Sequence, residues 1–284
     1  MPQPLPSVRE AGAGPAVVCL HSNASGSAQW RPLIERLAPR HRVIAPDLYG
    51  AGNSPEWPSD RKIALADEVE LLEPLLAAAG TPFALVGHSY GGAVALKAAL
   101  GERRRIAALV LYEPTLFALV DAATPPPNDV DGIRDTVTAA AHDLDRGDRD
   151  AAARRFIDYW SGEGSWQRVP AHRKPAMAAS IANIRRWGHA LFTEATPLAA
   201  FASLDIPVLL LTGTRSTASA RAVVERLSQV LPRVRVVEFA GLGHMGPVTN
   251  PAAVDPVIAD FISERLAAGQ RAGVGPPALA LRAF

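Results

Sequence analysis

Residues 83–100 read FALVGHSYGGAVALKAAL, and this stretch constrains the fold more than any other part of the chain. An apolar run of strand length ends in Gly-His-Ser-Tyr-Gly, and an alanine-rich helical pattern follows at once. The pattern predicts a strand, a sharp turn and a helix, with Ser89 at the apex of the turn. Gly87 and Gly91 would let the strand and the helix pass close beneath the Ser89 hydroxyl. The turn therefore indicates a serine nucleophile; the alternative is a glycine-rich turn with an idle serine.

Apolar runs of strand length alternate with helical patterns on both sides of this segment. Besides the strand and helix at Ser89, we expect strands at 16–21, 42–46, 106–112, 207–212 and 234–239, with a short edge strand at 5–10. Helices are expected at 30–37, 61–79, 220–231 and 251–266. This alternation predicts an α/β fold: a mostly parallel sheet flanked by helices.

The alternation stops in residues 115–204, which carry no strand pattern but three of the five tryptophans, Trp160, Trp166 and Trp187. We expect this stretch to form a helical cap inserted over the sheet edge, between core segments 1–114 and 205–266. Aromatic side chains there would wall an apolar pocket; a helical side lobe without a ligand role is the alternative. The Gly-, Pro- and Ala-rich residues 267–284 are expected to form a loose tail.

Composition narrows the functional classes. The chain has 284 residues, 48% of them apolar, which is enough for a sizeable core. A net charge of +1 argues against nucleic-acid or membrane-surface binding driven by bulk charge. Cys19 is the only cysteine, so no intramolecular disulfide can form. With no signal-peptide pattern and no apolar run of membrane-spanning length, a cytoplasmic protein is expected. The oligomeric state is left open.

Parallel strands bring their carboxyl ends to one edge of a sheet, so residues distant in sequence can meet there. Ser89, Glu113 and His244 each follow a predicted strand. An imidazole at position 244 could take the proton of the Ser89 hydroxyl and later give it to a leaving group.

The hexapeptide around His244, GLGHMG, also spells the dinucleotide-binding pattern G-x-G-x-x-G. We reject that interpretation because Pro247 and Thr249 precede the last helix and no strand follows to close a βαβ unit. Metal-ligand spacings such as H-E-x-x-H are absent, so no metal and no cofactor are expected.

Acyl transfer also needs two backbone N–H groups that stabilise a developing oxyanion. Tyr90, directly after the serine, can supply one, and Asn23 in the polar loop after the strand at 16–21 can supply the other. Ordinary turn chemistry is the alternative explanation for the polar loop.

Together these motifs resemble the α/β-hydrolase family. The resemblance rests first on GHSYGG at 87–92 and GLGH at 241–244. In addition, DLYGAGNS at 47–54 is similar to the family's D-x-x-G-x-G-x-S, and HSN at 21–23 with Trp30 is similar to its H-G-x oxyanion loop. It covers roughly residues 15–115 and 205–266. The resemblance implies a serine hydrolase with a helical cap between its sixth and seventh strands.

Two residues depart from the family pattern. Ser22 stands where the family usually has Gly, and Ser216 stands where it usually places the acid of the catalytic triad. A serine cannot carry the negative charge that orients and stabilises an imidazolium. Some members take the acid from the preceding strand, and Glu113 ends that strand here. We therefore expect Glu113 to be the acid; a cap residue such as Asp121, or no acid at all, is the alternative.

The resemblance and the residues lead to one functional expectation: hydrolysis of a small carboxylic ester or thioester through an acyl-enzyme on Ser89, with His244 and Glu113 completing the triad. A cofactor-free peroxidase-like activity and a hydrolase of C–C bonds are alternatives on the same scaffold. A non-catalytic ligand sensor is a third, motivated by Ser216. The expected partner is a small-molecule substrate, without nucleic acid or membrane.

Overall fold

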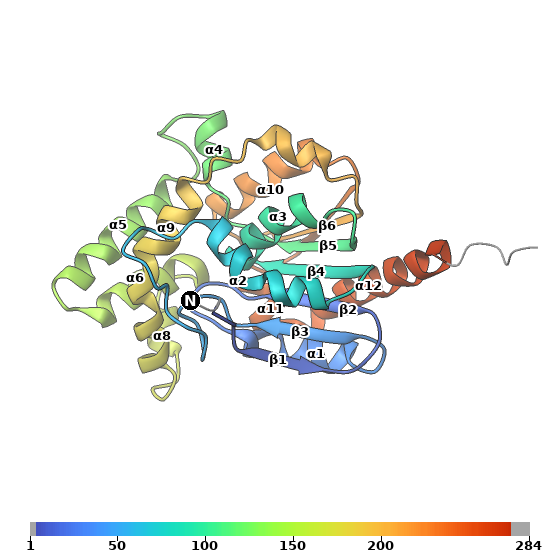
Figure 1. The fold of residues 1–284 in the computed structure, drawn as a ribbon. Helices are drawn as coiled ribbons and strands as arrows, with labels where there is room; N and C mark the ends of the chain where they lie inside the picture. Colours follow the sequence, from blue (N-terminus) through green and yellow to red (C-terminus); the bar gives the residue numbers. More distant parts are fainter. Residues whose placement is uncertain (1–3, 274–284) are drawn as a thin grey trace, which may run out of the picture.

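A computed structural model describes residues 4–273 and contains a seven-stranded sheet at its centre (Figure 1). The strands lie in the order β1-β3-β2-β4-β5-β6-β7. Their bounds are β1 Val8–Ala11, β2 Ala16–Leu20, β3 Arg42–Pro46, β4 Phe83–His88, β5 Ile106–Tyr112, β6 Val208–Gly213 and β7 Val234–Phe239. All neighbours are parallel except β1, which is antiparallel to β3. The predicted α/β fold with a mostly parallel sheet is confirmed.

The edge strand β1 begins three positions later than predicted from residues 5–10. Its first residue, Val8, pairs with Pro46, which is the last residue of β3. Residues before Val8 therefore have no partner strand, and Leu5 is left exposed.

Helices cover both faces of the sheet, as the continuous apolar strands require. Alternate residues of β2 illustrate the two faces: Val17 and Cys19 belong to one buried cluster, Val18 and Leu20 to the other. Helices α1 (Arg31–Leu37) and α12 (Pro251–Gly273) supply the first cluster, and α2 (Leu65–Ala78), α3 (Tyr90–Glu102) and α10 (Ala218–Val230) supply the second. The helices cover the two faces of the sheet but not the rim formed by the carboxyl ends of its parallel strands, which we call the free edge.

Two helices differ from their predicted bounds. Helix α2 begins at Leu65 rather than at residue 61, because the Asp67 carboxylate accepts the Ala64 N–H at 2.8 Å and caps the helix there. Helix α12 continues through Gly273, so the prediction of a loose tail from residue 267 is wrong for residues 267–273. The helix formers there outweigh the glycine at 269. The rest of the predicted tail lies outside the described residues.

Only helices and loops lie between β5 and β6. They are α4 Ala118–Ala123, α5 Asp131–Asp145, α6 Arg149–Ser161, α7 Ser165–Arg168, α8 Lys174–Ser180, the 3-10 turn η2 Ile181–Asn183, α9 Ile184–Phe192 and the 3-10 turn η3 Leu198–Ser203. Figure 1 shows α5, α6, α8 and α9 gathered beyond one end of the sheet. We call this segment the helical insertion. Within residues 4–273, no helix has the length and apolar character needed to cross a membrane.

Two short elements complete the chain: the 3-10 turn η1, Ser27–Trp30, directly before α1, and helix α11, Gly246–Thr249, directly before α12. Both flank loops that reach the free edge of the sheet, one after β2 and the other after β7.

Candidate active site

Ser89 lies at the apex of the turn between β4 and α3 and has a backbone φ of +56°. Non-glycine residues rarely occupy this region, so the conformation is held by the surrounding packing. A Cβ added at Gly87 would lie 2.5 Å from the Gly91 carbonyl oxygen, and one added at Gly91 would lie 2.4 Å from the Leu20 oxygen. Glycine at both positions lets strand and helix approach closely enough to hold the serine in this turn.

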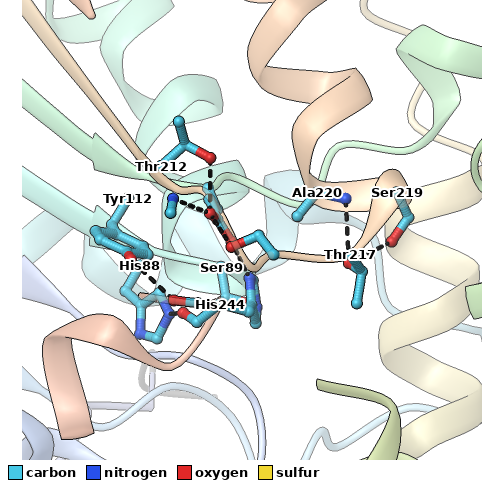
Figure 2. Close-up of polar contacts among 12 residues, drawn as sticks. His88, Ser89, Tyr112, Thr212, Thr217, Ser219, Ala220 and His244 are labelled. Carbon is cyan, nitrogen blue, oxygen red and sulfur yellow. Dashed lines mark hydrogen bonds and ion pairs between the residues drawn. The ribbon is translucent and has the colours of Figure 1, made fainter. Parts of the chain in front are cut away.

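His244 joins Ser89 to Glu113. Its Nε2 atom is 2.9 Å from Ser89 Oγ, and its Nδ1 atom is 2.8 Å from Glu113 Oε2. Figure 2 shows Ser89 and His244 side by side. Because a carboxylate accepts only, Nδ1 carries the proton, and Nε2 is left free to accept from the serine hydroxyl. All three side chains are at least 95% buried.

The second oxygen of Glu113 is held by three donors. Oε1 accepts hydrogen bonds from Thr212 Oγ1 and Gly213 N, both at 2.8 Å, and from Ser216 Oγ. Burial alone would raise the pKa of the Glu113 carboxyl, but the hydrogen bond and charge of His244, with those of Ser216 and Gly213, outweigh it. The pKa is therefore held below its ordinary value and the carboxyl is ionised at neutral pH.

Ser216, which stands where the family usually places its acid, donates a hydrogen bond to the Glu113 carboxylate. The loop after β6 thus donates to the carboxylate of Glu113, which directly follows β5. Asp121, the alternative acid, pairs instead with Arg134 at 2.7 Å. The positive φ of Glu113, +43°, marks the turn that directs this side chain across to β6.

The two predicted oxyanion donors, Asn23 and Tyr90, both flank Ser89. Within residues 4–273, neither backbone N–H has a hydrogen-bond acceptor in the protein. Asn23 and Ser89 line the same cavity. The phenol of Tyr90 is anchored away from the site, donating to Glu68 at 3.1 Å. Two free N–H groups beside a serine hydroxyl are the arrangement that a developing oxyanion needs.

Ser22, the other departure from the family pattern, begins a partly buried chain of hydrogen bonds. Its N–H and its hydroxyl both donate to Gln29 Oε1, at 3.1 and 2.9 Å. The Gln29 amide donates to His88 Nδ1 at 3.0 Å, and His88 Nε2 donates to the His244 carbonyl oxygen at 2.8 Å. These hydrogen bonds link the loop after β2 to the loop that holds His244.

His88 keeps one protonation state along this chain. Burial, and then the neighbouring His244, lower its pKa to about 3, so the ring is neutral at working pH. Tyr112 holds the same loop from a second point, since its hydroxyl donates to the Gly243 carbonyl oxygen at 2.9 Å (Figure 2). No sequence pattern identified Gln29 or Tyr112; His88 was visible only as part of the turn motif.

Trp160, on α6 of the helical insertion, stacks on the His244 ring, with ring centroids 3.9 Å apart and an interplanar angle of 27°. Tyr159, which directly precedes Trp160, shares a hydrogen bond of 2.8 Å with Ser219 on α10. This contact ties α6 to the core and keeps the indole over the imidazole. The insertion was expected to provide pocket walls, but contact with the histidine was not foreseen.

Two spaces meet at Ser89. The first is a pocket of about 20 Å³, with room for about one water molecule, lined mainly by apolar residues that include Phe117, Ile133, Phe156, Trp160, Trp187 and Leu191. The second is an open cleft of about 1480 Å³. Asn23 and Trp160 line both, so the reacting centre of a substrate would lie between a narrow apolar pocket and a wide open cleft.

No group of three or more His, Cys, Asp and Glu side chains that could hold a metal ion is present in residues 4–273. Cys19 is a free, buried thiol. The site described above is built from a hydroxyl, an imidazole, a carboxylate and backbone N–H groups, a set suited to acyl transfer rather than to metal binding.

Comparison with known proteins places this arrangement in context. A family described as "alpha/beta hydrolase fold" matches residues 15–251. Polyketide synthase ThaQ of Burkholderia thailandensis is 31% identical over 278 residues; the match covers 92% of this chain but only 12% of ThaQ. A pimeloyl-[acyl-carrier protein] methyl ester esterase of Aeromonas hydrophila is 26% identical, with 90% of this chain and 98% of the esterase covered. An alpha/beta hydrolase from Sphaerobacter thermophilus superposes with a TM-score of 0.70 at 30% identity, covering 90% and 95% of the two chains.

Proposed function

Because this chain belongs to the alpha/beta hydrolase family and is a hydrolase, we propose that it cleaves a small carboxylic ester or thioester through an acyl-enzyme on Ser89. The observation that carries the proposal is the unbroken line of hydrogen bonds from Ser89 through His244 to Glu113.

In the first half-reaction, Ser89 Oγ attacks the substrate carbonyl while His244 Nε2 takes the hydroxyl proton. The negative charge that forms on the carbonyl oxygen is accepted by the N–H groups of Asn23 and Tyr90. Glu113 stabilises the imidazolium through Nδ1. Collapse of the tetrahedral species then breaks the bond to the leaving group, which receives the proton from His244.

In the second half-reaction a water molecule gives its proton to His244 Nε2 and attacks the acyl carbon. The same two N–H groups stabilise the second oxyanion. The ester bond to Ser89 breaks, the serine recovers its proton, and the carboxylic acid is released. Only groups already in contact are required, and no cofactor enters the scheme.

The substrate class is supported from two sides. The name of the Aeromonas relative specifies ester hydrolysis, and its chain is matched over nearly its whole length. The narrow pocket next to Ser89 limits the acyl group to about the size of acetyl unless side chains move. The single buried cysteine supports a cytoplasmic location as part of the same proposal.

Of the other candidate functions, the non-catalytic sensor loses support, and the peroxidase-like and C–C bond hydrolase activities stay alternatives. A non-catalytic sensor was motivated by Ser216, but Glu113 now contacts His244 where the usual acid would. Peroxidase-like and C–C bond hydrolase activities use the same scaffold, and no observation favours either.

The test combines labelling and turnover. We expect a fluorophosphonate probe to label Ser89 and the protein to hydrolyse p-nitrophenyl acetate, with both signals lost in Ser89→Ala. Ser203→Ala serves as the matched control, since it removes an exposed serine hydroxyl that lines neither space at Ser89. A folded wild-type protein that is neither labelled nor active would refute the hydrolase mechanism and favour the sensor.

A further inference from the structure

We propose that the leaving group of the substrate is anionic and bears phosphate, and that it binds in the open cleft in front of Ser89. The inference rests on the proposed ester or thioester hydrolysis and specifies its substrate: a small acyl group joined to a phosphorylated alcohol or thiol, as in an acyl-CoA.

The position of His244 decides which part of the substrate enters which space. His244 lines the open cleft but not the narrow pocket. The departing oxygen or sulfur must receive its proton from this ring, so the leaving group lies on the cleft side. The narrow apolar pocket is left for the acyl group. The incoming water can then reach the acyl carbon by the path through which the leaving group departed.

Arginines stand on both walls of the cleft. Arg9 on β1 and Arg31 at the start of α1 belong to the core wall, while Arg168 at the end of α7 and Arg173 before α8 belong to the wall made by the helical insertion. All four side chains are exposed. Among the described residues none of the four has an ion-pair partner, and Arg168 donates only to Ser165.

The acidic residues of the cleft do not cancel this charge. Asp47 is buried and accepts the Ser27 N–H at 2.6 Å, so it serves the loop rather than the cleft. Glu56 is paired with Arg186 at 3.0 Å. A chain with a net charge of only +1 therefore presents four unpaired guanidinium groups to one cleft. Guanidinium groups bind phosphate through paired N–H donors, and arginines from both the core and the helical insertion suit a ligand with several negative charges.

A small neutral leaving group would not account for these features. Methanol or ethanol would occupy a small part of the 1480 Å³ and contact none of the arginines. A long arm with apolar and amide parts would instead run past Met177, Val169 and Met245, which also line the cleft, before its phosphates reach the guanidinium groups.

The experiment compares acetyl-CoA with the acetyl thioester of N-acetylcysteamine, which has the same thioester and nearby amide but no phosphate. We expect kcat/KM to be about 10-fold higher for acetyl-CoA, mainly because its KM is lower. This preference should shrink as the salt concentration rises from about 0.05 M to about 0.5 M. Arg31→Gln, Arg168→Gln and Arg173→Gln should each lower the ratio of the two kcat/KM values about twofold to fivefold. Arg104→Gln, an exposed arginine outside the cleft, should leave the ratio unchanged.

The outcomes separate this inference from the proposed function. If p-nitrophenyl acetate is hydrolysed but acetyl-CoA is not preferred, or if the ratio is insensitive to salt and to the cleft arginines, the phosphate site is refuted and the hydrolase stands. If Ser89 is neither labelled nor active toward any of the three substrates, the proposed function fails and this inference fails with it.

Discussion

Replacing Glu113 with Gln tests the least conventional part of the site. Three donors point at Oε1, from Thr212, Gly213 and Ser216, and only an acceptor fits there. The carbonyl oxygen of a glutamine would therefore take the Oε1 position, which turns its NH2 group toward His244 Nδ1. That group donates, so Nδ1 would have to accept, and the ring proton would move to Nε2. In this tautomer His244 cannot take the proton of Ser89.

The expected loss follows from this reversal. Glu113→Gln removes both the imidazolium's counter-charge and the productive tautomer, and such a change lowers kcat by roughly 10³- to 10⁴-fold, or about 4–5 kcal/mol in activation free energy. KM should change little, because Glu113 is fully buried and does not line either substrate space. Since the pKa of Glu113 is lowered, the acid is ionised in wild type at neutral pH, and the loss should persist across roughly pH 6–9.

A second substitution distinguishes a catalytic charge from a structural defect. Ser216→Asp returns a carboxylate to the position from which the family usually supplies it. In the double variant Glu113→Gln/Ser216→Asp we expect at least about 10-fold recovery of kcat over Glu113→Gln. Ser216→Asp alone should lower activity, because a second carboxylate would lie against Glu113 in a buried site.

The assay is p-nitrophenyl acetate hydrolysis under saturating substrate, with thermal unfolding measured for each variant. A folded Glu113→Gln protein whose kcat is within about 10-fold of wild type would refute the argument from donors and tautomers. Failure of the double variant to recover, with the fold intact, would show that the charge cannot be supplied from the loop after β6.

Three further predictions concern side-chain contacts that only the structure revealed. Gln29→Leu leaves the Ser22 donors and the His88 acceptor unpaired, so it should lower kcat more than it changes KM and lower the free energy of unfolding by about 1–3 kcal/mol, measured by kinetics and denaturant titration. Trp160→Leu removes the ring stacked on His244, so it should lower kcat about 10-fold while admitting butyryl esters to the pocket. Trp187 lines the pocket without stacking on His244, so Trp187→Leu should admit butyryl esters without lowering kcat. A series of p-nitrophenyl esters measures both effects. Burial raises the pKa of Glu68 to about 8, so the folded state keeps a proton that the unfolded chain releases above about pH 4.5. The free energy of unfolding should therefore fall by about 1.4 kcal/mol per pH unit between roughly pH 5 and 8. The melting temperature should fall with it, and Glu68→Gln should abolish this pH dependence.

The sequence alone determined the fold and the place of Ser89 in it. The turn at Ser89 is specified locally, because Gly87 and Gly91 are the residues that permit the close crossing of strand and helix. The alternation of strands and helices then implies that the strand ends at Ser89, Glu113 and His244 reach one edge of the sheet. These features depend on local sequence patterns, which a single sequence displays, and on the handedness that parallel connections share in general.

The tertiary structure alone decided which side chains meet. Glu113 rather than Asp121 contacts His244, and the reason is a backbone turn at Glu113 and three donors from β6 and the loop after it, all about 100 residues away from Glu113 in the sequence. Helix α6 carries Trp160 onto His244 because Tyr159 ties that helix to α10. Contacts of this kind depend on the direction of each side chain and on packing between distant helices, and periodicity and motif spacing carry no information about either.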